Sequence, residues 1–227
     1  MICDNLRHIR STIAQTALAC GRDPETIKLL AVSKGMGIDR ISQAIDCGQT
    51  LFGENYLQEA ADKIRQLPPT VGWHFIGHLQ GNKARLAAGL FAVVETVDRL
   101  KVAQALDRQA KALNREVSIL VQVNTGREQQ KSGVLPEETG QLLRLIAQTT
   151  DLRVRGLMTL PPYSPDPEKS RPYFKILKQL AEQCAARQLF ADNRRVELSM
   201  GMSGDYPVAI EEGATIVRVG TALFGTR

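Results

Sequence analysis

A lysine at the end of an apolar segment is the first residue in this sequence that suggests chemistry. Lys34 closes the segment KLLAVSK and keeps the parity of Leu30 and Val32, which places all three on one face of a predicted strand. Burial there disfavours an ammonium, and a second cation such as Arg218 disfavours it further. The neutral amine attacks a carbonyl and forms a Schiff base. The alternatives are a lysine that extends to solvent and one that pairs with Glu54.

Two glycine-rich segments near the end of the sequence indicate an anion site. LSMGMSGDYP and VRVGTALFGTR each follow a predicted strand, and together they contain Ser199, Gly201, Ser203, Gly204, Gly220 and Thr221. Glycine lets backbone approach a ligand and hydroxyls donate to phosphate, although either turn alone is equally explained as a tight connection. An amine for an aldehyde and a cradle for a phosphate together indicate pyridoxal 5′-phosphate (PLP).

An arginine accompanies the second of these segments. Arg218 precedes Gly220 by two residues and shares its inward parity. An arginine at the pyridine nitrogen donates a hydrogen bond and resists a protonated ring, which makes the cofactor a weaker electron sink. The alternative is an arginine paired with Glu197 or Glu211.

Eight apolar segments must position these residues. They lack strict alternation, which is typical of parallel strands buried on both faces, and they cover residues 28–34, 50–55, 72–77, 91–98, 117–124, 154–160, 195–201 and 215–222. Helical patterns lie between most of them, and one more helix precedes the first. This alternation predicts an α/β fold, a single (β/α)₈ TIM barrel domain over residues 1–227 with an extra N-terminal helix. A doubly wound sheet is the competing fold, but the first βα turn lacks its GxGxxG fingerprint.

Residues able to contact a ligand close nearly every predicted strand. They are Lys34, Glu54, Asn55, His74, His78, Thr96, Asp98, Asn124, Met158, Thr159, Ser199 and Arg218. In a (β/α)₈ barrel these strand ends meet at one rim, where the active site lies. We expect His74 to hydrogen-bond in the barrel mouth. We expect no metal site, because HFIGH spans a strand end and a glycine rather than a helix.

Composition excludes several classes of protein. The net charge of +5 comes from 29 basic and 24 acidic residues without a Lys/Arg run, so we expect no nucleic-acid partner. No segment approaches the ~20 apolar residues of a membrane span, and the charged N-terminus is no signal peptide. We therefore expect a cytoplasmic protein without a membrane partner. Its cysteines, which match no zinc spacing, are expected to be reduced thiols: Cys3, Cys20, Cys47 and Cys184.

Seven motifs give the sequence a resemblance to a known family. They are AVSKG, FGENYLQE, WHFIGHLQGNK, VNTGREQQKSG, GLMTL, LSMGMSGDYPVAIEEG and VRVGTALFG, in that order over essentially the whole length. The chain resembles the pyridoxal phosphate homeostasis protein family, which has the barrel of the alanine racemase N-terminal domain. The resemblance implies PLP held covalently on Lys34, phosphate contacts at Ser199, Gly220 and Thr221, Arg218 at the pyridine nitrogen and Asn55 near the ring. With the strand-end residues, the expected cofactor site is Lys34, Asn55, His74, Met158, Ser199, Gly201, Arg218, Gly220 and Thr221.

Two functions share this site. A carrier holds PLP on Lys34, buffers it and delivers it to PLP-dependent apo-enzymes, with effects on amino-acid metabolism. The alternative is a PLP-dependent amino-acid racemase. Racemases of this fold take a tyrosine from an appended β domain of the partner subunit, and we expect no such C-terminal domain after Arg227. We therefore expect a monomeric carrier in vitamin B6 homeostasis, without catalytic residues. An interaction module with an empty barrel leaves the set of Lys34, Ser199, Arg218 and Gly220 unexplained.

Overall fold

Eight parallel strands close into one barrel in the computed structural model, which describes residues 1–225. Each strand pairs with its neighbours in chain order, and β8 returns to pair with β1. The strands are β1 (Lys28–Val32), β2 (Leu51–Glu54), β3 (Gly72–Phe75), β4 (Val93–Val97), β5 (Ser118–Val123), β6 (Arg153–Thr159), β7 (Glu197–Met202) and β8 (Ile216–Val219). The predicted barrel is confirmed, and the pairing of β8 with β1 excludes the open sheet. A single domain over 1–227 remains our proposal, since 226–227 lie outside the described residues.

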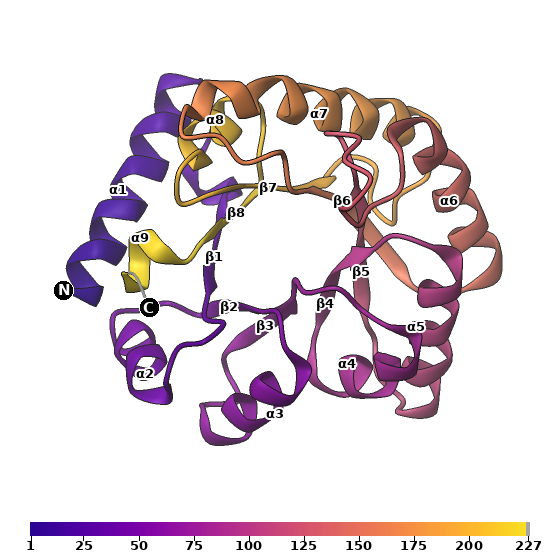
Figure 1. Cartoon of the computed structure of the whole chain (residues 1–227), viewed down its shortest axis with the longest axis horizontal. Coiled ribbons are helices and arrows are strands. Elements are labelled where there is room, and N and C mark those ends of the chain that lie inside the picture. Colours follow the sequence, from indigo (N-terminus) through magenta and orange to yellow (C-terminus); the bar gives the residue numbers. More distant parts are fainter. Residues whose placement is uncertain (226–227) are drawn as a thin grey trace.

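Helices surround the ring of strands (Figure 1). They are α1 (Ile2–Ala19), α2 (Ile38–Asp46), α3 (Leu57–Gln66), α4 (Ala84–Leu90), α5 (Leu100–Ala112), α6 (Pro136–Thr149), α7 (Arg171–Ala186), α8 (Tyr206–Glu211) and α9 (Thr221–Phe224), with 3₁₀ turns at Pro24–Thr26, Gly81–Lys83 and Pro167–Ser170. The predicted N-terminal helix is α1, which packs against α2, α8 and α9. No helix of the described chain has the length and apolarity to cross a membrane.

Two apolar cores lie on either side of the strands. The inner core fills the barrel with Leu30, Ile76, Val93, Leu120, Met158 and Ile216, and Val32 packs against it. The outer core lies between strands and helices and includes Ala31 and Phe52. Leu30 and Val32 are therefore inward while Ala31 is outward, which confirms the parity predicted for β1. The strand ends at Val32, and Lys34 lies in the turn that follows.

The starts of three helices lack a side-chain cap. No side chain caps α4. Arg99 is the N-cap of α5, and the preceding Asp98 forms an ion pair with Arg99 (3.1 Å). Gly37 is the N-cap of α2, and Asp39 lies in the first turn, where an acidic side chain is favourable.

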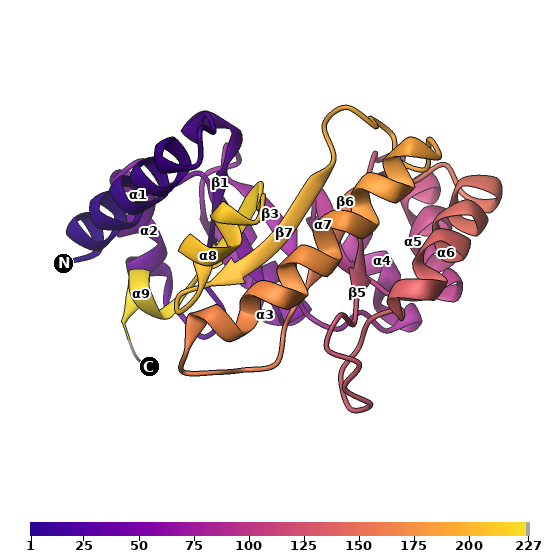
Figure 2. The same cartoon turned by 90° about the horizontal axis from the view of Figure 1, so that it is seen from above.

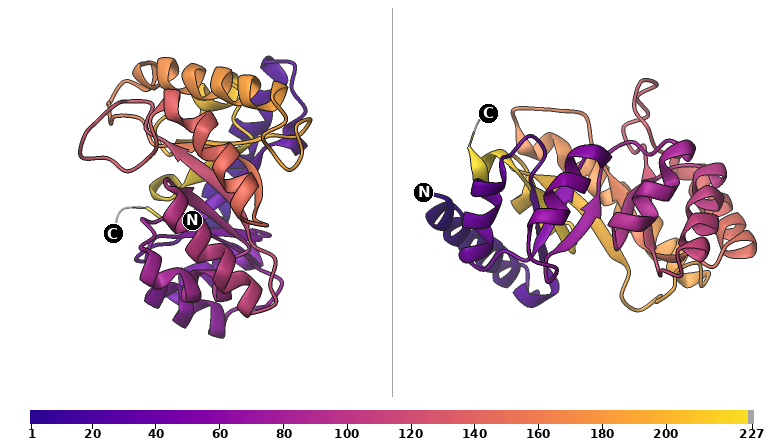
Figure 3. Two further views of the ribbon diagram at one scale, coloured as in Figure 1. Left: turned by 90° about the vertical axis from the view of Figure 1, so that its right-hand side faces the viewer. Right: turned by 90° about the horizontal axis from the view of Figure 1, so that it is seen from below.

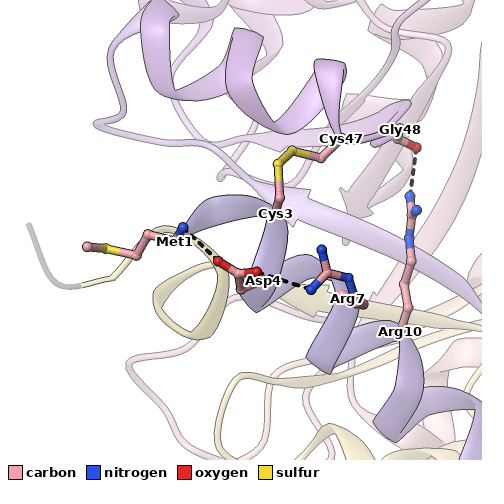
Figure 4. The surroundings of a disulfide bond; sticks show 7 residues. All are labelled: Met1, Cys3, Asp4, Arg7, Arg10, Cys47 and Gly48. Atoms are coloured by element: carbon pink, nitrogen blue, oxygen red, sulfur yellow. Dashed lines mark hydrogen bonds and ion pairs between the residues drawn. A yellow bond between two sulfur atoms is a disulfide. The ribbon is translucent and has the colours of Figure 1, made fainter.

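The expectation of four reduced cysteines is wrong for two of them. Cys3 in α1 and Cys47, directly after α2, form a disulfide (Figure 4), while Cys20 and Cys184 are free. The Cα atoms of Cys3 and Cys47 are 5.4 Å apart, within the usual range for a disulfide. Beside the disulfide, Arg10 donates a hydrogen bond to the carbonyl of Gly48 (2.6 Å). The bond joins two helices that meet only in the fold, which explains why sequence spacing did not indicate it.

Candidate functional site: a polar cavity at the carboxyl ends of the strands

A cavity of about 330 Å³ opens at the carboxyl ends of the strands, within the size range of small-molecule sites. Six of the nine predicted site residues line it: Lys34, Asn55, Met158, Arg218, Gly220 and Thr221. The loop after β6 contributes residues 160–164 to the wall. Figures 2 and 3 show this loop and the loop after β5 projecting from the same face of the barrel. Six of the predicted residues therefore meet at one cavity at this end of the barrel.

A tight turn carries Lys34 into the cavity. The amide of Met36 donates to the carbonyl of Ser33 (3.0 Å) and closes the turn. Gly35 has φ +71°, a left-handed conformation that glycine adopts without strain. Lys34 is half-buried and lines the cavity beside Val32. The amine is thus part of a ligand-sized cavity rather than of the inner core.

An unsatisfied amide oxygen lies in the same wall. Asn55 directly follows β2, and its Oδ1 is buried without a hydrogen-bond partner among the described residues. A buried acceptor without a donor costs about 1–3 kcal/mol, which a donating ligand would recover. The unpaired oxygen of Asn55 therefore favours a ligand that carries a hydrogen-bond donor.

Arg218 contributes a buried cation to the cavity. It is 3% exposed, and its guanidinium donates to Ser199 Oγ (2.6 Å) and to the carbonyl of Thr159 (2.7 Å). Burial lowers the pKa of Arg218, against the opposing effects of Glu95 and Asp205.

The two glutamates that were the alternative partners of Arg218 both pair with other cations. Glu197 instead pairs with Lys28 (2.6 Å) and Arg155. Glu211 pairs with Arg171 (2.5 Å). Arg218 is therefore held at the cavity by contacts within the barrel interior.

A chain of polar groups continues from Arg218 through the barrel interior. Ser199 Oγ donates to Glu95 Oε2 (2.5 Å), and His74 Nδ1 lies 2.6 Å from Glu95 Oε1. Burial raises the pKa of Glu95, but the hydrogen bonds of His74 and Ser199 and the charges of His74 and Arg218 outweigh it and hold the pKa below its ordinary value. An ionised Glu95 thus balances Arg218. We missed Glu95, although a glutamate within the valine-rich segment VVETV was an available signal.

Three predicted site residues do not line the cavity. His74 lies deeper and lines a groove formed by strand beginnings, together with Thr50 and Gly72. Ser199 is fully buried between Glu95 and Arg218. Gly201 has φ +89°, and an added Cβ would lie 2.5 Å from Cβ of Ala209, so glycine is required for α8 to pack on β7. Direct cofactor contacts of these three residues stay predictions.

Ser203 and Gly204 line the cavity where Ser199 was expected. Ser203 Oγ accepts hydrogen bonds from the amides of Gly220 (3.2 Å) and Ala222 (3.3 Å). A hydroxyl that accepts two bonds keeps its own hydrogen to donate. Ser203, Gly220 and Thr221 thus form a polar cradle from two neighbouring strand ends.

No group of three metal-ligating side chains occurs within residues 1–225.

Comparisons with known proteins find a family model and relatives that match nearly the whole chain. A family model described as alanine racemase, N-terminal domain, matches residues 4–227. The chain is 43% identical over 231 residues to the pyridoxal phosphate homeostasis protein of Vibrio alginolyticus, covering 100% of this chain and 97% of that protein. Identity is also 43% over 230 residues to the protein of the same name from Escherichia coli K12, covering 100% and 97%.

Solved structures show the same likeness. PipY of Synechococcus elongatus PCC7942, solved with PLP bound, superposes with a TM-score of 0.85 at 34% identity, covering 99% of this chain and 100% of that chain. An alanine racemase of Clostridium difficile 630 superposes with a TM-score of 0.76 at 17% identity, covering 99% of this chain and 57% of that chain. The second likeness is one of fold alone.

Proposed function

Because the chain belongs to the pyridoxal phosphate homeostasis protein family, we propose that it binds PLP and acts in intracellular vitamin B6 homeostasis. The observation that carries the proposal is one cavity lined by both an amine, Lys34, and a hydroxyl cradle, Ser203 and Thr221. Relatives at 43% identity bear the name of that function, and PipY was solved with PLP bound.

Each part of the cofactor has a matching group in the cavity. PLP would supply an aldehyde that the amine of Lys34 is placed to receive, and their condensation to a Schiff base would release one water. Ser203, Gly220 and Thr221 would hold the phosphate, and Asn55 Oδ1 would accept a hydrogen bond from a ring substituent. We assign the serine of the cradle to Ser203 rather than Ser199, because Ser203 lines the cavity.

Arg218 favours a carrier over a catalyst. Placed at the ring nitrogen, a guanidinium donates a hydrogen bond and disfavours ring protonation, which weakens the electron sink that racemisation requires. Among the described residues, Tyr163 is the one tyrosine that lines the cavity. It is 90% exposed, so the protein does not hold its side chain in place as an acid or base on the opposite face of the substrate. We therefore propose a carrier that buffers PLP and delivers it to PLP-dependent apo-enzymes, acting as a cytoplasmic monomer.

The proposal predicts a yellow protein. Purified wild-type protein mixed with PLP should absorb in the visible, and borohydride should fix the cofactor to the peptide that contains Lys34. The variant Lys34→Ala should lose the visible band and the trapping while the cradle still binds PLP weakly. A wild-type protein that stays colourless with PLP would refute the proposal.

A second experiment separates carrier from racemase. Incubation with common amino acids in heavy water reports proton abstraction at Cα even without inversion. A carrier should show no exchange above that of free PLP, and it should activate an added apo-enzyme. Exchange at enzymatic rates that disappears in Lys34→Ala would establish a catalyst instead.

A further inference from the structure

Three charged side chains meet behind the turn that carries Lys34. Glu54 ends β2, and Glu59 and Lys63 lie one turn apart on α3. Lys63 Nζ lies 2.7 Å from Glu54 Oε1 and 2.5 Å from Glu59 Oε1. The side chains of Lys63 and Glu54 are 6% and 0% exposed, and that of Glu59 is 30% exposed. A cluster so buried differs from an ordinary surface ion pair.

This cluster bonds to the residues on both sides of Lys34. On one side, the Ser33 carbonyl accepts from Lys63 Nζ (2.7 Å), and Ser33 Oγ donates to Glu54 Oε1 (2.7 Å). On the other side, the Gly35 amide donates to Glu59 Oε1 (2.6 Å). The backbone before and after Lys34 is therefore fixed by charged groups from a neighbouring strand and its helix.

Stability alone does not account for this arrangement. Replacing buried ion pairs with apolar side chains of similar volume is often neutral or stabilising, because desolvation offsets their attraction. Here the cost is visible: Glu54 Oε2 is buried without a hydrogen-bond partner among the described residues. Burial also raises the pKa of Glu54 against the opposing bonds from Lys63 and Ser33.

We propose that Glu54, Glu59 and Lys63 form a positioning clamp that fixes the direction in which Lys34 projects into the cavity. The role of the clamp rests on the proposed function and extends it. The cradle binds the phosphate, while the clamp determines how readily the amine of Lys34 reacts with the aldehyde. Loss of the clamp should therefore weaken Schiff base formation without weakening phosphate binding. The three clamp residues are positioning residues, since none of them lines the cavity.

Two ligands separate these effects. PLP carries the aldehyde, whereas pyridoxine 5′-phosphate carries an alcohol in its place and reports binding alone. In Glu59→Ala, which loses the acceptor for the Gly35 amide, PLP affinity and the borohydride-trapped fraction should fall about tenfold, the effect of one charged hydrogen bond. Affinity for pyridoxine 5′-phosphate should stay close to the wild-type value, because its binding does not require reaction with Lys34.

Two further variants of α3 serve as controls. Glu59→Gln keeps an amide oxygen that accepts from Gly35 and should restore most of the trapping. Asp62→Ala removes an exposed carboxylate from the same helix, where it forms an ion pair with Arg65, and should behave as wild type with both ligands. Ser33→Ala, which removes only the hydroxyl bond to Glu54, is a milder clamp variant and should show the same discrimination between ligands.

The outcomes are distinct. Selective loss of trapping in Glu59→Ala or Ser33→Ala, with Glu59→Gln recovered, supports the clamp. Equal weakening of both ligands, or no change in either, overturns it and leaves the cluster a purely structural feature. A wild-type protein that binds pyridoxine 5′-phosphate but traps no PLP would instead contradict the proposed function, so the two failures are distinguishable.

Discussion

Replacing Ser203 with alanine should weaken PLP binding far more than replacing Ser199. Ser203 lines the cavity and accepts from the amides of Gly220 and Ala222, so its own hydrogen remains for a phosphate oxygen. One hydrogen bond to a charged acceptor contributes about 1.5–3 kcal/mol. At about 1.4 kcal/mol per tenfold, affinity should fall between roughly 10-fold and 150-fold.

The matched variant Ser199→Ala should act mainly on the fold. Its hydroxyl bonds to Glu95 Oε2 (2.5 Å) and accepts from Arg218 (2.6 Å), and all three side chains are buried. Removing it leaves two buried charged groups each short of a partner, which costs about 1–3 kcal/mol of unfolding free energy. PLP affinity should fall less than in Ser203→Ala.

Two measurements on each variant test this reasoning. Visible absorbance during PLP titration gives affinity, and urea denaturation of the cofactor-free protein gives the free energy of unfolding. Ser203→Ala should change the PLP affinity, whereas Ser199→Ala should change the free energy of unfolding. The reverse result, with Ser199→Ala losing affinity at unchanged stability, would refute the assignment of the phosphate to Ser203 and return it to Ser199.

Three further predictions concern stability. Reducing the Cys3–Cys47 disulfide, whose cysteines are 44 residues apart, should lower the free energy of unfolding by up to about 4 kcal/mol. A melting temperature that stays the same with and without reductant would contradict this. Lys63→Met should lower the free energy of unfolding by about 3–5 kcal/mol in urea denaturation, because it leaves the buried carboxyl of Glu54 without its cation, and adding Glu54→Gln should recover part of that loss. Burial raises the pKa of Glu54 above its ordinary 4.5. The contribution of Glu54 to the free energy of unfolding is therefore present below pH 4.5 and is lost as pH rises through the folded pKa. Glu54→Gln should flatten this decline in the free energy of unfolding.

The alternation of strands and helices predicted the barrel, and parity predicted which side chains point inward, but parity does not give depth along a strand. Ser199 points inward, yet it pairs in register with Ile216 of the inner core and lies within the barrel, below the mouth. Ser203 lies one residue past the end of β7, where the cavity opens. Gly201, with φ +89°, interrupts the regular alternation between the two serines. Choosing between them therefore required the fold.

Contacts between elements were the second limit. Glu59 and Lys63 are four residues apart on a predicted helix, a spacing that usually marks a solvated ion pair. Only the packing of α3 against the end of β2 shows that Lys63 is buried and bonds to the turn before Lys34. The same holds for Cys3 and Cys47, whose pairing depends on how α1 meets α2.

Closure of the barrel is what creates the site. Lys34 follows the first strand, whereas the cradle and Arg218 belong to the last two. In an open sheet with strands in chain order these groups would lie at opposite edges. Here β8 pairs with β1 from Lys28↔Ile216 to Ala31↔Val219, with Leu30 opposite Arg218.

The N-terminal helix supports the same junction. The side-chain amide of Asn5 in α1 donates to the carbonyl of Leu223 in α9 (2.9 Å), the short helix that starts at Thr221. The guanidinium of Arg22, in the loop after α1, donates to the carbonyls of Ile210 (2.6 Å) and Ala214 (2.8 Å). The extra helix thus holds the segment that carries the cradle against the strand that leads to Lys34. Amine and phosphate sites therefore depend on one junction, and loosening it would separate the groups that must bind the two ends of one cofactor.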